Sequence, residues 1–295
     1  MQTSDAPFAL SPADQRRFDD EGYIILKEII PLRQVEQGRQ ALAQLVDAEA
    51  QRLLQTKKIT DPLLGEPFET RLFRLYENHL DEAPQAWRNV LHKEGLYGFF
   101  YNQRLLDIVE GFLGQEIRLY PNYSCRPKFP EAAQHLILWH QDAAYTKDFL
   151  PKGSDVSEKQ IADLRMINVW SPLVPARVEN GCMQFIPGTH KLGLVPHTKE
   201  KFYLQIADEW LRPRLAEAID VEMDPGDVVL FSNLLFHQGQ PNRSRSIRWT
   251  LDWRYQDAAQ PTLRRFNGHM VRSRLHPETV VKNEQAWAAI PQEYF

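Results

Sequence analysis

SIRWTLDWRYQ, at residues 246–256, is the stretch that decides the fold, because polar and apolar residues alternate along it. Such alternation is typical of a β-strand, in which successive side chains point to opposite faces. The apolar face consists of Ile247, Trp249, Leu251, Trp253 and Tyr255, and the polar face of Arg248, Thr250, Asp252 and Arg254. A polar face inside a protein is costly unless it lines a cavity that holds water or a ligand. The stretch therefore predicts a strand between an apolar layer and a polar cavity.

Other short β-rich segments surround this strand in the sequence and are separated by Pro, Gly and polar turns. They are EIRLYPNYSCRP at 116–127, HLILWHQDA at 135–143, RMINVWSPLV at 165–174, GCMQFIPG at 181–188 and GDVVLF at 226–231. This pattern is typical of an antiparallel sandwich or barrel. The loop at 146–164 contains a short charged helical pattern, and we expect it to lie over the mouth of the barrel.

The N-terminal part of the chain is predicted to be mainly helical. Ser11 and Pro12 are typical of a helix start, and Gly22 ends that helix after a segment at 13–21. Further helical patterns follow a β-rich segment at 23–30, and they cover residues 31–54, 86–100 and 103–113. We expect one domain over residues 1–295, with a helical buttress mainly at 11–113, a barrel core at about 116–258 and a C-terminal extension at 259–295.

The composition excludes several classes of protein. The chain has 295 residues, of which 43% are hydrophobic and 25% charged, as in ordinary globular proteins. A net charge of −4 gives no general attraction to nucleic acid, and two cysteines cannot form a disulfide framework. No stretch approaches 18 consecutive apolar residues, and the N-terminus has no basic start followed by an apolar run. We therefore expect a cytoplasmic protein without nucleic-acid or membrane partners; the sequence leaves its oligomeric state open.

Two histidines and one aspartate are candidate metal ligands. His140 and Asp142 are two residues apart on a predicted strand, so they should share a face. His237 ends the apolar stretch in GDVVLFSNLLFHQG, where the barrel mouth is expected. Two imidazoles and a carboxylate leave one side of an octahedral ion open, as in non-haem Fe(II) oxygenases, whereas catalytic zinc also uses this ligand set. When His140 and Asp142 are considered without His237, the alternative interpretation is that they form a hydrogen-bonded pair on a surface loop.

Arg248 is a candidate for binding a carboxylate that enters this cavity. It lies on the polar face of the predicted strand at 246–256. Its planar guanidinium can hold a carboxylate through two hydrogen bonds. An internal ion pair, for example with Asp252, is the alternative interpretation.

The motifs together resemble the phytanoyl-CoA dioxygenase family of Fe(II)- and 2-oxoglutarate-dependent oxygenases. They are HQD at 140–142, ENGCMQFIPGTHKLG at 179–193, GDVVLFSNLLFHQG at 226–239 and an arginine 11 residues after the distal histidine. The resemblance extends from about residue 11 to 260. It implies a double-stranded β-helix, a jelly-roll or cupin-like barrel, which is mainly β and flanked by helices.

The resemblance also implies roles for individual residues. It predicts that His140, Asp142 and His237 bind Fe(II), and that Arg248 holds the far carboxylate of 2-oxoglutarate. Trp170, Arg71 and Asn122 match positions near the co-substrate, although a structural role is the alternative for each. His190 lies in a predicted turn, and we expect it not to bind iron. His135, His197, His269 and His276 are expected to be surface or hydrogen-bonded residues.

The expected activity is oxidation, usually hydroxylation, of an unactivated C–H bond in a small molecule, with 2-oxoglutarate and O2 consumed and succinate and CO2 released. One alternative is a barrel that binds metal and 2-oxoglutarate as a sensor or non-catalytic binding protein. Another is a cupin-like metal enzyme that needs no co-substrate.

Four arginines of the C-terminal segment offer either attraction for an anionic substrate or an exposed basic face; they are Arg264, Arg265, Arg272 and Arg274.

Overall fold

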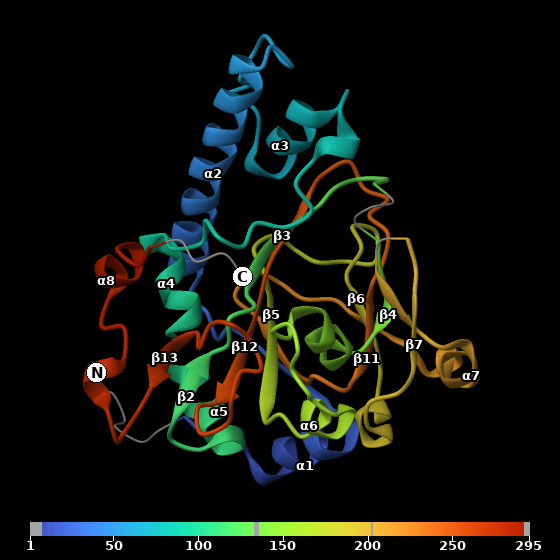
Figure 1. The fold of residues 1–295 in the computed structure, drawn as a ribbon. Helices are drawn as coiled ribbons and strands as arrows, with labels where there is room; N and C mark the ends of the chain where they lie inside the picture. The colour runs from blue at the N-terminus through green and yellow to red at the C-terminus, as the bar shows by residue number, and fades with distance from the viewer. Residues whose placement is uncertain (1–7, 133–135, 202, 292–295) are drawn as a thin grey trace.

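Two antiparallel sheets face each other across a cavity in the computed structural model, which describes residues 8–132, 136–201 and 203–291 (Figure 1). The larger sheet has the strand order β1-β10-β5-β12-β2-β13, and β3 also pairs with β12. Its strands are β1 (Tyr23–Leu26), β2 (Ile117–Leu119), β3 (Ser124–Lys128), β5 (Met166–Pro172), β10 (Val228–Ser232), β12 (Arg248–Asp257) and β13 (His269–Arg272). This arrangement confirms the predicted double-stranded β-helix.

The smaller sheet has the order β4-β11-β6-β9, and a separate hairpin joins β7 to β8. The four strands of the smaller sheet are β4 (Ile137–His140), β6 (Met183–Ile186), β9 (Ile219–Val221) and β11 (Phe236–Gly239). The hairpin consists of β7 (His197–Lys199) and β8 (Leu204–Ile206). Strands β4 and β11 lie side by side, and this pairing later positions the candidate metal ligands.

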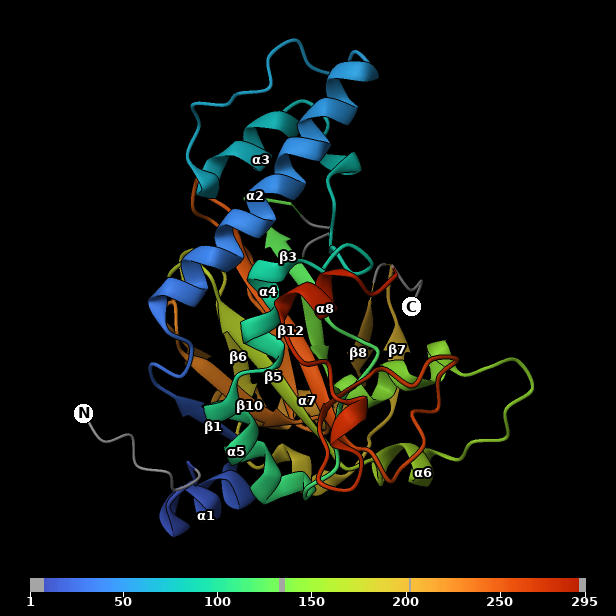
Figure 2. The ribbon, with the colours of Figure 1, turned by 90° about the vertical axis from the view of Figure 1, so that its left-hand side faces the viewer.

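Helices cover the outer face of the larger sheet, as Figure 2 shows for α2, α4, α5 and α8. The α-helices within the described ranges are α1 (Pro12–Glu21), α2 (Leu32–Gln55), α3 (Phe68–Tyr76), α4 (Glu94–Phe100), α5 (Gln103–Leu113), α6 (Glu158–Ala162), α7 (Asp208–Leu211) and α8 (Glu284–Ala288). In Figure 1, α2 and α3 extend beyond the barrel at the top of the molecule. Over the described part of the chain, no helix has both the length and the apolar character needed to cross a membrane.

Strand β12 has the two faces that its sequence predicts. Its aromatic residues are fully buried in the core that the sheet shares with the helices. Trp249 stacks on Phe68 of α3, and Trp253 meets Phe100 of α4 edge to face. The side chains on the opposite face line the cavity between the sheets; they include Arg248, Asp252 and Arg254. Packing of the aromatic face fixes the direction in which the polar face points.

Several boundaries differ from the predictions. The predicted helix at 86–100 begins only at Glu94, because Trp87 instead forms a β-bridge with Cys125 of β3. The predicted strand at 116–127 is divided into β2 and β3 around Pro121, which has no amide hydrogen for a sheet ladder. The β-rich segment at 23–30 is a strand only to Leu26, and Glu28 has a positive φ of 54°. By contrast, α1 has the expected Ser11 cap.

Candidate active site

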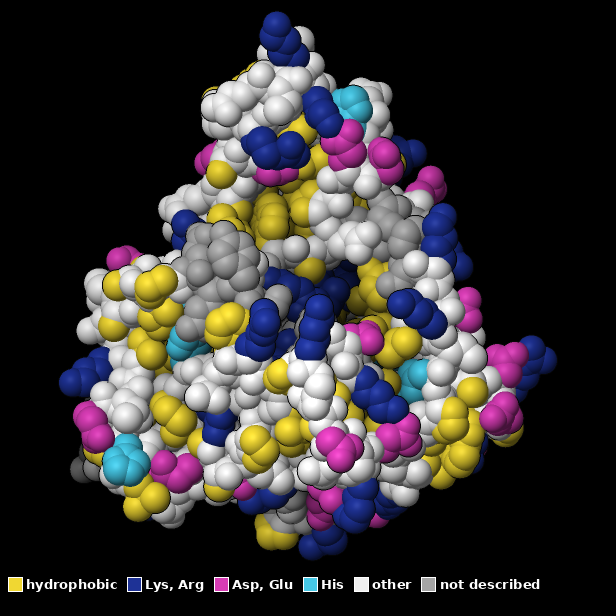
Figure 3. All heavy atoms as spheres, in the orientation of Figure 1, with side chains coloured by type: hydrophobic (Ala, Val, Ile, Leu, Met, Phe, Trp, Pro, Cys, Tyr) yellow, Lys and Arg dark blue, Asp and Glu magenta, His cyan; other side chains and the backbone are white. Residues whose placement is uncertain are grey.

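A cavity of about 630 Å³ lies between the two sheets. Figure 3 shows it as a hollow in the middle of the molecular face, in which dark blue Lys and Arg side chains gather. Strands of both sheets line it, together with the 3-10 helix η3 (Asp142–Phe149) and the segment that precedes α4. A cavity of this size is in the range of small-molecule sites.

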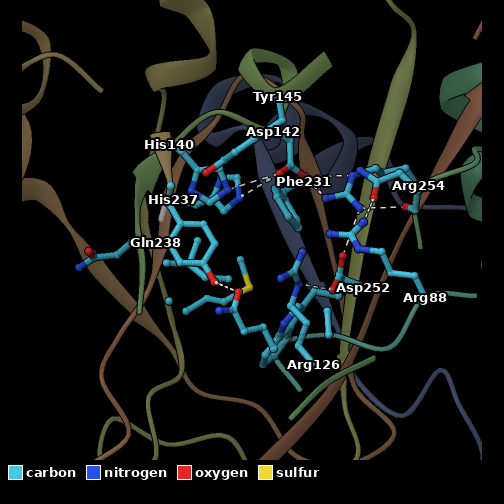
Figure 4. A pocket seen from close by; sticks show the side chains of 18 of the residues that line it. Arg88, Arg126, His140, Asp142, Tyr145, Phe231, His237, Gln238, Asp252 and Arg254 are labelled. Atoms are coloured by element: carbon cyan, nitrogen blue, oxygen red, sulfur yellow. Dashed lines mark hydrogen bonds and ion pairs between the residues drawn. The ribbon is translucent and has the colours of Figure 1, made fainter. Parts of the chain in front are cut away.

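His140, Asp142 and His237 meet at one side of this cavity (Figure 4). His140 of β4 lies directly opposite His237 of β11 in the antiparallel register, and their ring centroids are 4.0 Å apart. Asp142 Oδ1 lies 3.4 Å from His140 Nε2 and 3.8 Å from His237 Nε2. Among the described residues, this trio is the only group of three or more potential ligands close enough to hold one metal ion.

Asp142 reaches the trio by a different route from the predicted one. Strand β4 ends at His140, and Asp142 is the first residue of η3. The prediction that both side chains lie on one face of one strand is therefore wrong in detail. The turn into η3 brings the carboxylate towards the imidazoles, and the same helix places Tyr145 at the cavity wall.

Both imidazoles are oriented by the same local contact. His140 Nδ1 lies 2.7 Å from the Leu138 carbonyl oxygen, and His237 Nδ1 lies 2.9 Å from that of Leu235. A carbonyl oxygen only accepts, so each Nδ1 carries the hydrogen and each Nε2 of a neutral ring presents a lone pair. Burial, followed by proximity to His140, lowers the pKa of His237 to about 3, which keeps this ring neutral. Two lone pairs and a carboxylate oxygen then converge where a cation fits.

Arg254 holds the carboxylate in place from behind. Its Nη2 and Nε donate to Asp142 Oδ2 at 2.5 and 3.1 Å, which leaves Oδ1 directed at the imidazoles. Burial alone would raise the pKa of Asp142, but Arg254 and then the two histidines hold it well below its usual value. Asp142 is therefore a carboxylate in the folded protein.

Arg248 and Trp170 lie together in another part of the cavity wall. The Arg248 guanidinium stacks over the Trp170 ring at 5.2 Å, and its Nη1 donates to the Gly181 carbonyl at 2.8 Å. Its Nε is buried and has no hydrogen-bond partner among the residues that the structure describes. Lys128, opposite Arg248 in the β3–β12 register, is also buried, and burial and Arg248 lower its pKa well below the usual value. The predicted alternative, an ion pair between Arg248 and Asp252, is not found among the described residues. Asp252 instead pairs with Arg126 and Arg254.

Asn122 and Arg71 occupy quite different places. Asn122 lines the cavity, where its Oδ1 accepts from Arg88 at 2.6 Å and its backbone carbonyl accepts from Arg254 at 2.9 Å. Arg71 lies on α3, where it donates to Asp47 Oδ1 at 2.6 Å and to the Pro62 carbonyl. Arg71 thus joins α3 to α2 and the following loop, and it is not among the residues that line the cavity.

The histidines that were expected not to bind iron lie apart from the trio in other contacts. His190 packs against α1 and contacts the Asp19 carbonyl, while His197 accepts from the Gln141 amide. His269 lies in an aromatic cluster with Trp287, and His276 is exposed beside Glu278. His135 lies outside the described residues.

The C-terminal arginines mostly face other partners. Arg272 pairs with Asp107 and Glu110 of α5, and Arg274 also pairs with Glu110. Arg264 donates to Tyr120, and Arg265 is exposed. None of the four is among the residues that line the cavity.

Sequence reasoning missed the roles of Arg254, Arg126 and Arg88 in this cavity. The alternation of residues 246–256 already placed Arg254 on the polar face, so its contact with Asp142 had a visible signal. The sequence has no such signal for Arg126 and Arg88, because pairing between distant segments brings them into the cavity. In the region of the loop predicted at 146–164, η3 supplies Tyr145 and Asp148 to the cavity wall, while α6 packs beside η3.

Comparisons with known proteins agree with this architecture. The phytanoyl-CoA dioxygenase (PhyH) family model matches residues 18–250. "Dioxygenase lolE1" of Epichloe uncinata is 39% identical over 94 residues, which are 31% of this chain and about a third (34%) of that protein. The "1-deoxypentalenic acid 11-beta-hydroxylase" of Streptomyces arenae is 24% identical over 83% of this chain and 80% of its own.

Solved structures show the same fold. EctD from S. alaskensis, crystallised with 2-oxoglutarate and 5-hydroxyectoine, aligns with a TM-score of 0.59 and 19% identity, over 88% of this chain and 79% of that one. The family match covers most of the chain and agrees with the expected cofactors, Fe(II) and 2-oxoglutarate. The chain therefore belongs to the phytanoyl-CoA dioxygenase family and is a non-haem Fe(II)- and 2-oxoglutarate-dependent oxygenase.

Proposed function

We propose that this enzyme hydroxylates an unactivated C–H bond of a small metabolite or natural-product intermediate. One oxygen atom of O2 enters the substrate as a hydroxyl group, and the other enters succinate as 2-oxoglutarate loses CO2. The observation that carries the proposal is the convergence of His140, Asp142 and His237 in a cavity that also contains Arg248. The relative from Streptomyces arenae, named as a hydroxylase, supports this outcome over other oxidations.

His140, Asp142 and His237 are the proposed ligands of Fe(II). The fit rests on their chemistry, because two Nε2 lone pairs and one anionic oxygen directed at one point would repel each other without a cation between them. Bound Fe(II) supplies the activation of O2, which no side chain of the cavity can perform. The protein residues hold the ligands in place and leave the cavity side open to small molecules.

Arg248 is the proposed anchor for the far carboxylate of 2-oxoglutarate, with Trp170 beside it. Its unpartnered buried Nε is the supporting observation, since a buried donor without an acceptor is costly and a carboxylate would satisfy it. Burial also lowers the pKa of Arg248 to about 10, and an anion bound beside it would oppose this effect. The stacked Trp170 ring limits the directions that the guanidinium can take.

Variants of the ligands test the metal assignment. We expect His140→Ala and His237→Ala to lose stoichiometric Fe(II) with little change in far-UV circular dichroism, because each removes one of three protein ligands at an open cavity. Iron content after anaerobic loading is the measurement. Full iron occupancy in either variant would contradict the assignment.

The co-substrate assignment has its own test. Arg248→Gln should weaken 2-oxoglutarate binding by about tenfold or more, because it removes a charge-assisted pair. Anaerobic titration of the Fe(II)-loaded protein, followed through its visible charge-transfer band, measures this affinity. An unchanged affinity for 2-oxoglutarate in this variant would contradict the proposed role of Arg248. Tight binding without succinate formation over a broad substrate panel would instead favour the sensor alternative.

A further inference from the structure

Arg88 and Arg126 form a second cationic group in the cavity, apart from Arg248. Figure 4 shows both on the side of the cavity opposite His140 and His237, with Asp252 nearby. Arg126 comes from β3, whereas Arg88 comes from the segment before α4. Neither side chain has a place in the metal and co-substrate assignments made above.

A short backbone pairing explains why both arginines point into the cavity. Trp87 and Cys125 exchange two backbone hydrogen bonds of 2.8 and 2.9 Å as an antiparallel bridge. The Cys125 side chain belongs to the core beneath the sheet, and the Trp87 side chain packs against that core. Their chain neighbours must then point the other way, and Arg88 and Arg126 do line the cavity. The bridge therefore builds this cationic wall from two distant segments.

The charges of the cavity are not balanced by its own carboxylates. The two inner carboxylates, partly buried Asp142 and buried Asp252, are already engaged by Arg254 and Arg126. Asp148, the remaining carboxylate of the lining, is exposed. Arg88 and Arg248 are left without an ion pair among the described residues. The far carboxylate of 2-oxoglutarate accounts for Arg248, so Arg88 still lacks an anion.

Arg88 is held in a place where an anion would be stabilised. Its Nη1 donates to the neutral Asn122 side chain at 2.6 Å, which fixes the guanidinium without neutralising it. Burial and then the nearby Arg126 lower the pKa of Arg88 to about 10. Although Asp252 offsets part of this effect, like charges and burial both favour entry of an anionic group.

We propose that the primary substrate is an organic acid whose free carboxylate is bound by Arg88, with Arg126 beside it, while its carbon skeleton lies towards His140 and His237. This inference rests on the proposed function, because it takes Arg248 as occupied by 2-oxoglutarate. Apolar side chains of the wall that can contact the skeleton include Ile137, Met183 and Phe231. The cavity of about 630 Å³ has room for 2-oxoglutarate and a small acid, whereas a coenzyme A thioester would extend outside it and offers no free acyl carboxylate.

Paired acids and amides test this substrate class directly. The probes are 3-phenylpropionate, cyclohexanecarboxylate, decanoate and a wider panel of free acids, each with its primary amide. Calorimetric titration uses the enzyme loaded anaerobically with Fe(II) and 2-oxoglutarate. We expect at least one acid to bind about tenfold or more tightly than its amide. Arg88→Gln should abolish that preference, because glutamine can keep the contact with Asn122 but has no charge.

Arg265→Gln is the matched control, because it removes an equally charged but exposed side chain outside the cavity lining. It should keep the preference for acids. The proposal is overturned if no acid in the panel binds better than its amide, if octanoyl-CoA binds and free acids do not, or if the preference survives in Arg88→Gln. Failure of the unmodified enzyme to bind 2-oxoglutarate would instead refute the proposed function, and so the two failures are distinguishable.

Discussion

Arg254 is the side chain on which the geometry of the metal-binding trio most depends. It donates two hydrogen bonds to one oxygen of Asp142 and another to Asp252, so one guanidinium orders two carboxylates of the cavity. A ligand held in this way has lost its rotational freedom before the metal binds. Such supporting contacts are known to tune metal affinity strongly.

Replacing Arg254 should therefore weaken metal binding without touching a ligand. We expect Arg254→Gln to lower Fe(II) affinity by roughly 10- to 100-fold, because Asp142 loses its partner and its fixed orientation. Anaerobic competition with a metal chelator measures the affinity, and Arg265→Gln serves as the charge control. An affinity within twofold of that of the unmodified enzyme would refute the importance of this contact.

At the scale of elements, the turn before β6 positions Arg248. Gly181 has φ +80°, and its carbonyl accepts from Arg248 Nη1. A Cβ at this position would lie 2.4 Å from the Gln240 carbonyl oxygen and 2.9 Å from Lys128 Cε. The turn thus combines a left-handed backbone with close packing, and only glycine meets both requirements.

Gly181→Ala is expected to cost about 1–3 kcal/mol of unfolding free energy and to weaken 2-oxoglutarate binding, because relief of the clash must move the carbonyl that holds Arg248. Gly153→Ala is a matched control, since Gly153 has φ +82° but open space around its Cβ direction. It should lose some stability and keep its affinity for 2-oxoglutarate. Urea unfolding and co-substrate titration measure the two effects. Equal co-substrate affinity in both variants would contradict this account of the turn.

At the scale of the whole molecule, buried histidines make stability depend on pH. His269 contacts both His92 and the Trp287 ring of α8, and burial followed by the nearby His92 lowers its pKa to about 4. The Tyr123 hydroxyl also contacts both histidines. Burial likewise lowers the pKa of His92 and of His197, the latter to about 4. The fold therefore favours the neutral form of each ring.

The sign of the pH effect follows from these lowered pKa values. Below pH 6.5 the unfolded chain binds protons that the folded protein excludes, so stability falls until the pH reaches about 4. Between pH 7.5 and pH 5, His269 alone lowers the free energy of unfolding by an amount on the order of 2 kcal/mol. Urea unfolding of the metal-free protein at pH 7.5 and pH 5 should show a smaller loss in His269→Gln and an unchanged loss in the exposed control His276→Gln. Equal losses in all three proteins would contradict this account.

Much of the fold was predictable because local sequence determined it. The alternation at 246–256 predicted both faces of β12, and Ser11 and Gly22 predicted the ends of α1. The three candidate ligands were also visible, since the chain places them at the ends of recognisable apolar stretches.

The remaining features could not be read from neighbouring residues. The bridge between Trp87 and Cys125 joins segments 38 residues apart and replaces part of a helix that local pattern favoured. Arg88 belongs to the cavity only because of this bridge. Similarly, Arg71 has a sequence context like that of a co-substrate ligand, but α3 packs against α2, where Arg71 donates to Asp47.

The central place of β12 in the larger sheet has a consequence for synthesis on the ribosome. This strand pairs with β5, β2 and β3, yet it begins only at residue 248 of 295. Until it emerges, a nascent chain carries three earlier strands with unsatisfied edges, which are prone to join other chains. Stalled or truncated products that end before β12 should thus aggregate or recruit chaperones, however well the preceding helices form.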